Sequence, residues 1–214
     1  MLSFHTSPLT QPGEGDSGGM NVYVRELVSA LAQAGVECST YTRRMHRDQP
    51  DEVFVEPGHR VVHIDAGSFT VPKEGLPGYV DAFTDGVREH LAASGGTDVL
   101  HANYWLSGVA GHRLKHELDL PLVTTFHTLA RVKAEGGDPE PAVREQAEIQ
   151  VIGCADAICV SCAEEEAQAC EDRGHVEPVV RDPHDTCLFL ERVRRPKKPR
   201  NYECHQRDAG RKEN

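Results

Sequence analysis

The stretch His5–Gly35, "HTSPLTQPGEGDSGGMNVYVRELVSALAQAG", is a glycine-rich, proline-punctuated loop that runs into an amphipathic helix. The helix is predicted over Met20–Ala34, because apolar residues recur there at helical spacing. This apolar stripe consists of Val24, Leu27, Val28 and Leu31. Gly35 suits the residue that ends such a helix. The apolar segment before the loop, Met1–Phe4, is long enough only for the end of a strand.

Outward from this helix, predicted strands and helices alternate as far as about Arg173. The predicted strands are Val36–Thr42, Arg60–Ile64, Asp98–Ala102, Pro121–Phe126 and Asp156–Ser161. The predicted helices are Leu76–Ala93, Trp105–Leu118, Pro141–Gly153 and Ala163–Arg173. This alternation predicts an α/β fold with a mostly parallel sheet and helices on both faces. Ligands of such sheets bind beyond the carboxyl ends of the strands.

The composition divides the chain into two unlike parts. The 214 residues carry a net charge of −11, yet residues 191–214 hold nine Lys or Arg against four Asp or Glu. The strand and helix alternation stops after about Gly174, so we expect a domain over 1–173 and an irregular or disordered basic tail over 174–214. The acidic body argues against nucleic-acid binding, and such tails are usually only solvated.

The sequence also bears on compartment. No apolar run reaches the roughly 18–20 residues that a membrane span needs, and the N-terminus lacks the basic and apolar regions of a signal peptide. Seven scattered cysteines are typical of reduced thiols. We therefore expect a cytoplasmic protein without a membrane span.

Two patterns suggest a redox or metal site and are weak. The pair Cys159-x-x-Cys162 lies within and just after an apolar strand and no second pair follows, which favours core cysteines. His101 and His127 could form a metal pair, but no third ligand has convincing spacing. We expect no metal site.

The glycine pair Gly18–Gly19 lies at the predicted start of the first helix. The start of a helix presents unpaired backbone N–H groups and a partial positive charge, and glycines let an anion approach closely. Asp16 or Ser17 is the expected N-cap. The stretch matches neither a Walker A loop nor G-x-G-x-x-G, so a dinucleotide dehydrogenase is poorly supported. The alternative is that the two glycines only make a tight turn.

Four motifs together resemble the family 4 retaining glycosyltransferases of the GT-B fold. They are "HTSPLTQPGEGDSGGMNVYV" (5–24), "HANYWLSG" (101–108), "TTFHTLARVK" (124–133) and "VSCAEEE" (160–166). Within the family they are most similar to the enzymes of mycothiol biosynthesis that glycosylate an inositol phosphate. A member of the neighbouring sucrose-phosphate synthase type would more typically read Asp-Thr-Gly-Gly-Gln at the glycine pair, and it remains an alternative.

The resemblance implies an architecture and a reaction. Family members have two Rossmann-like domains, of which the first binds the acceptor and the second binds most of the nucleotide sugar. The implied reaction moves a hexosyl group, expected to be N-acetylglucosamine from UDP-N-acetylglucosamine, to an inositol phosphate with retention of configuration. The chain itself is expected to hold no cofactor, although Mg²⁺ accompanies the donor in some full-length members.

The resemblance also implies roles for individual residues. His127 would lie near the transferred sugar as the catalytic candidate, and Gln11, Pro12 and Gly19 would lie by the donor. The implied acceptor-binding residues are His5, Asp16, Ser17, Gly18, Gly19, Met20, Asn21, Lys73, Tyr104, Thr128 and Arg144. Lysine and arginine are natural partners of phosphate, which agrees with these roles.

Each assignment has a simpler alternative. Lys73 could be a solvated surface charge, and His127 a hydrogen-bonded structural histidine. Arg144 could pair locally with Glu145 and Glu148 of its own helix.

Both ends of the chain depart from the family pattern. Met1 falls inside the expected first strand, and no second array of strands and helices follows "VSCAEEE". We therefore expect a truncated or frameshifted chain that lacks the donor domain, completed by that domain on another chain or associated as a homodimer. The alternative from a different class is a non-catalytic remnant that only binds a polyol phosphate.

Overall fold

Six strands form one sheet in the computed structural model, which describes residues 1–11, 13 and 18–173. One half of the sheet has the order β1-β3-β2 and the other half β4-β5-β6. The strands are β1 (Cys38–Arg43), β2 (Glu52–Glu56), β3 (His59–Ile64), β4 (Leu100–Asn103), β5 (Leu122–Thr125) and β6 (Ala157–Cys159). All pairings are parallel except that of β2 with β3.

The first residues of the chain join the two halves of the sheet. Leu2 forms parallel bridges both to Tyr41 of β1 and to Ala102 of β4. Its N–H donates to the carbonyl of His101 at 2.7 Å, and Leu2 and Phe4 are wholly buried. The segment therefore acts as a short central strand, and the chain leaves it at the point where the strand order reverses.

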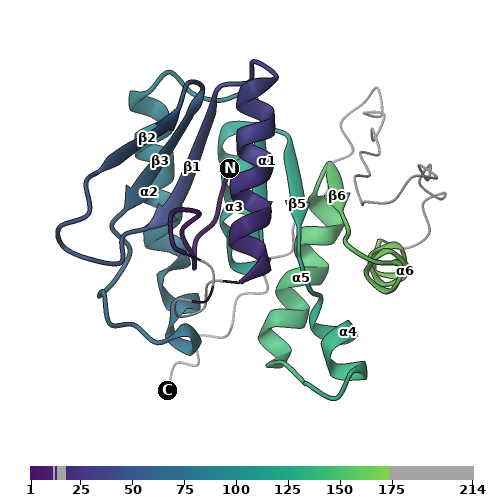
Figure 1. Ribbon diagram of the computed structural model, residues 1–214. Helices are drawn as coiled ribbons and strands as arrows, with labels where there is room; N and C mark the ends of the chain where they lie inside the picture. The colour runs from purple at the N-terminus through teal and green to yellow at the C-terminus, as the bar shows by residue number, and fades with distance from the viewer. Residues whose placement is uncertain (12, 14–17, 174–214) are drawn as a thin grey trace, which may run out of the picture.

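Helices cover both faces of this sheet (Figure 1). Helix α1 packs against β1 and β3, whereas α2, α3 and α5 lie side by side, with α3 on β4 and β5. The helices are α1 (Gly19–Gln33), α2 (Val80–Ala93), α3 (Trp105–Leu118), α4 (Ala130–Glu135), α5 (Ala142–Cys154) and α6 (Ala163–Asp172), with a 3₁₀ helix η1 (Lys73–Tyr79) before α2. The predicted α/β architecture is confirmed.

Helix α3 lies close to the sheet at Gly111. A Cβ atom at this position would lie 2.8 Å from Leu122 Cδ1 and 3.3 Å from Ala102 Cβ. A side chain there would force Leu122 or the helix to shift within a closely packed core. A glycine therefore suits the middle of α3.

Four details of the sequence prediction were incomplete or wrong. Strand β2 was missed because it is a short edge strand whose Phe54 is 80% exposed, so it shows little of the pattern of a buried strand. Helix α4 was missed because it has only six residues. The helix predicted from Leu76 is instead η1 followed by α2, with Pro77 inside η1. The predicted N-cap was also wrong, because Gly18 occupies that position without a side-chain cap.

The predicted basic tail, 174–214, lies outside the described residues, as do Pro12, Asp16 and Ser17. Within the described part of the chain, no helix is both long and apolar enough to cross a bilayer.

Candidate functional site

Residues far apart in the sequence meet beyond the carboxyl ends of the parallel strands. The loop after the Leu2 bridge, Tyr104 after β4, and His127 and Thr128 after β5 all leave the sheet at this edge. The start of α1 and helix α4 lie at the same end of the sheet (Figure 1). The expectation that these motifs share one edge is confirmed.

His5 lies at the centre of this group. Its ring stands 4.4 Å from the ring of Tyr104, and its Nδ1 atom is buried without a hydrogen-bond partner among the described residues. The pKa of the His5 imidazole is lowered to about 3, first by burial and then by three nearby basic groups. Those groups are Lys73, His127 and Arg144. His5 is therefore neutral at pH 7.

Tyr104 and His127 both adopt backbone conformations that side chains rarely accept. Their φ angles are 74° and 65°, in the region that favours glycine. The His127 ring is held by a 2.9 Å hydrogen bond between Nε2 and Asn103 Oδ1 and by an edge contact with Tyr23. Such strained residues persist only where their surroundings fix them, and they cluster at functional sites.

Arg144 is a buried residue that holds Tyr104 and Thr128 of the site in place. Its side chain is almost fully buried and each of its three nitrogens has a partner. Nε donates to Glu148 at 2.7 Å, Nη1 to the Tyr104 hydroxyl at 3.2 Å, and Nη2 to the Thr128 carbonyl at 2.6 Å. The guanidinium also lies 4.9 Å from the centre of the Tyr104 ring. Arg144 therefore fixes two of the predicted acceptor-binding residues.

The simpler alternative for Arg144 is confirmed in part. It pairs with Glu148 on the next turn of α5, whereas Glu145 points elsewhere and lies 3.8 Å from Arg131. Glu148 also accepts the backbone N–H of Ala130 at 2.7 Å, which ties the start of α4 to α5. Burial raises the pKa of the Glu148 carboxyl.

A second carboxylate, Glu140, lies on the outer side of Arg144. Its Oε1 atom is 2.9 Å from Arg144 Nη1 and also contacts Lys133 Nζ. An anion that reaches Arg144 must therefore displace this carboxylate or bind beside it.

The start of α1 leaves room for a ligand. Gly18 and Gly19 are exposed, and a Cβ at either position would meet nothing within 4 Å. The side chain of Asn21 is turned inward instead, accepting from the Thr6 hydroxyl at 2.7 Å and donating to the Ser7 carbonyl at 2.8 Å. Asn21 thus fastens the opening loop to the helix.

The remaining predicted site residues are less constrained. Lys73 and Gln11 are exposed, and Met20 is half-buried. Lys73 is the first residue of η1 and lies near enough to His5 to affect its charge. It is the one predicted cation of the site that is exposed among the described residues.

Two positioning residues were missed by the sequence analysis. Asn103 holds His127, and Tyr23 packs on it. Glu148, which holds Arg144, was anticipated from its spacing of one helical turn. The contacts of Asn103 and Tyr23 depend on the tertiary fold.

The two weak patterns, the histidine pair and the cysteine pair, have different outcomes in the structure. His101 hydrogen-bonds to Thr125 at 2.8 Å, whereas His127 bonds to Asn103. Cys159 is buried as expected, but Cys162 is exposed at the N-cap of α6 and is not a core residue.

The described site does not fit Mg²⁺. Magnesium prefers carboxylate and phosphate oxygens. The carboxylates beside Arg144 are Glu140 and Glu148, and both are already bound to basic or N–H groups.

Known proteins are similar to this chain in sequence and in structure. Residues 18–182 match the glycosyl transferase 4-like domain. A D-inositol 3-phosphate glycosyltransferase of Xylanimonas cellulosilytica is 48% identical over 191 residues, which is 83% of this chain and 46% of that protein. The protein of that name from Thermobispora bispora is 44% identical over 177 residues, 79% of this chain and 41% of the relative. The chain thus spans less than half the length of these curated relatives.

Among solved structures, sucrose-phosphate synthase from Thermosynechococcus elongatus superposes with a TM-score of 0.73 at 31% identity. The superposition covers 78% of this chain and 42% of that one.

Proposed function

Because the chain belongs to the glycosyl transferase 4-like family, we propose that residues 1–173 form the acceptor-binding domain of a glycosyltransferase whose acceptor is an inositol phosphate. The names of the relatives that are 44–48% identical support this acceptor. The transferred group is a hexosyl unit, N-acetylglucosamine from a nucleotide sugar, moved with retention of configuration. A donor domain, on a longer chain or on a partner, completes the site.

The convergence of basic and hydroxyl groups on His5 is the observation that carries the proposal. His5 contacts the acceptor, while Lys73 neutralises the acceptor's phosphate. Tyr104 and Thr128 offer hydroxyls to the phosphate and are held in place by Arg144. Arg144 is thus a positioning residue, and it meets the phosphate directly only if Glu140 moves away.

The remaining assignments concern the donor side. Gly19, which is exposed at the start of α1, lies by the donor diphosphate together with Gln11. His127, held by Asn103, lies near the transferred sugar. Donors aimed at the leaving diphosphate stabilise its charge as the bond breaks. The described residues supply few of them, so joint positioning by a donor domain is needed for turnover.

Isothermal titration of the 214-residue protein with inositol 3-phosphate tests the acceptor site. We expect one binding site per chain, and Lys73→Ala should weaken it by about tenfold or more, since hydrogen bonds to charged groups contribute about 1.5–3 kcal/mol. Lys73 is exposed, so its loss leaves the fold intact. The matched control is Lys115→Ala, which removes a lysine from the last turn of α3, paired there with Asp156.

Separate titrations with inositol and inorganic phosphate show which half of the acceptor is recognised. No heat from a folded sample, or equal weakening by the two lysine variants, would refute the assignment. Acceptor binding without transfer, even when a donor domain is supplied, would favour the non-catalytic alternative.

A further inference from the structure

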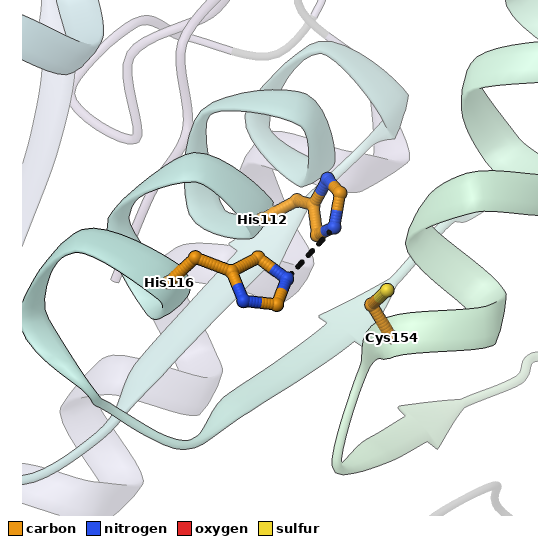
Figure 2. Close-up of side chains that lie close together, drawn as sticks. All are labelled: His112, His116 and Cys154. Carbon is orange, nitrogen blue, oxygen red and sulfur yellow. Dashed lines mark hydrogen bonds between the residues drawn. The ribbon is translucent and has the colours of Figure 1, made fainter. Parts of the chain in front are cut away.

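A set of metal-ligand side chains lies at the far ends of α3 and α5, away from the site described above. His112 and His116 are four residues apart on α3, and Cys154 is the last residue of α5. Their ligand atoms all lie within 4.8 Å of one another. Figure 2 shows the two imidazole rings facing each other, with Cys154 on the neighbouring helix. In the described part of the chain, no other set of three such side chains meets this criterion.

We propose that His112, His116 and Cys154 bind a zinc ion that links α3 to α5. The proposal does not depend on the glycosyltransferase assignment. Two imidazole nitrogens and one thiolate form a donor set that zinc favours, whereas magnesium and calcium require oxygen ligands. Three protein ligands leave the fourth tetrahedral position for water.

The distances suit a tetrahedral ion. Zinc lies about 2.0–2.1 Å from imidazole nitrogen, so two such nitrogens stand about 3.3 Å apart around it. The Nε2 atoms of His112 and His116 are 3.1 Å apart and share a hydrogen bond. On binding, the ring that donates this hydrogen bond carries its proton on Nδ1 instead of Nε2 and stays neutral, and the Cys154 thiol releases its proton to solvent. The metal thus binds at atoms that are already close together.

The surroundings allow an ion to enter. His116 is exposed, and His112 and Cys154 are half-buried. A cavity of about 120 Å³ has His116 in its wall, together with Lys115, Asp119, Leu120, Pro121 and Asp156. The exposed His116 gives the ion an entry path, which a binding site of this kind requires.

Titration of the untagged 214-residue protein with zinc in competition with a chromophoric chelator tests the proposal. We expect one ion per chain, and His112→Gln, His116→Gln and Cys154→Ser should each reduce the affinity at least about 10–100-fold, the effect of losing even an outer-shell partner. His116→Gln is the decisive variant because His116 is exposed and its loss leaves the core unchanged.

His46→Gln and Cys162→Ser, two exposed residues outside the set, serve as matched controls. Cobalt should give a thiolate charge-transfer band that is lost in Cys154→Ser and kept in Cys162→Ser. Zinc should also raise the unfolding temperature of the parent protein and leave that of His116→Gln unchanged. Absence of stoichiometric binding, or binding that none of the three ligand variants weakens, would overturn the proposal.

Discussion

The two ends of the helix pair α3 and α5 differ sharply. At their starts, Tyr104 and Arg144 belong to a buried network in which every guanidinium nitrogen has a partner. At their ends, His112, His116 and Cys154 lie close together and partly exposed. At the starts of the helices, hydrogen bonds within the protein hold the polar groups in place. At the ends, the side chains present atoms that could bind an ion.

This difference shows how one pair of packed helices can both position residues for a ligand and offer a metal site. The network at the starts of the helices sets the positions of side chains for a ligand that binds and leaves. The cluster at their ends can only affect how firmly the two helices are held together. Changes at the first end should therefore alter both stability and acceptor binding, while changes at the second should alter stability only when metal is present.

Among the substitutions, the largest expected effect follows from Arg144→Ala. The substitution leaves the buried Glu148 carboxylate without its cation, which costs about 3–5 kcal/mol when one partner of a buried pair is removed. The free energy of unfolding, measured by urea denaturation, should fall by that amount, and Tyr104 should lose its anchor.

The double variant Arg144→Met with Glu148→Leu serves as the control for Arg144→Ala. It removes both charges and should recover much of the loss. A loss below about 1 kcal/mol for Arg144→Ala would show that the pair is not buried in solution.

Acid should also destabilise the protein through the buried histidines near the carboxyl edge of the sheet. The pKa values of His5 and His101 are lowered to about 3 and that of His127 to about 4, in each case chiefly by burial. Histidines of the unfolded chain take up protons below about pH 6.5, and the folded ones do not, so stability is full above that pH and is lost as pH falls toward 4. The slope should reach about 1.4 kcal/mol per pH unit for each histidine.

Urea denaturation between pH 7.5 and 4.5 measures this slope. His101→Asn should reduce this slope by the contribution of one histidine. The side chain that replaces His101, the partner of Thr125, does not take up a proton in this pH range. A midpoint that does not change with pH would contradict the burial of these rings.

The smallest effects concern the middle and the end of the helix pair. Gly111→Ala forces a Cβ to 2.8 Å from Leu122 and should destabilise the fold by about 1–3 kcal/mol. Gly153→Ala, in the last turn of α5, meets nothing within 4 Å and should stabilise it by about 0.4–1 kcal/mol. The urea midpoint should fall for Gly111→Ala and rise for Gly153→Ala. A change in the same direction for both variants would refute the packing described.

The sequence was informative where a residue's role follows from its place on a strand or helix. The α/β alternation, the family resemblance and the shared edge of the motifs were all predicted and are confirmed. The positive φ of Tyr104 and His127 could not be predicted, because residues other than glycine seldom adopt it and the surrounding packing enforces it here.

Contacts across the fold were equally hidden from sequence analysis. The inward turn of Asn21 and the bond from His127 to Asn103 join segments whose spacing carries no signal. Likewise, two histidines four apart are visible in "GHRLKHEL", but Cys154 comes 38 residues after His116 and only the fold brings it near. The roles assigned to the site residues remain predictions until the titrations are done.

The central position of Leu2 has a consequence for how the protein forms. Its two backbone partners lie about 40 and 100 residues later in the chain, so this segment is synthesised well before either strand with which it pairs. Contacts this distant in sequence slow folding, and apolar segments that wait unpaired are prone to aggregate. The half of the sheet that contains β1 and β3 can assemble early. Its edge at the Leu2 segment stays unpaired until β4 has been synthesised.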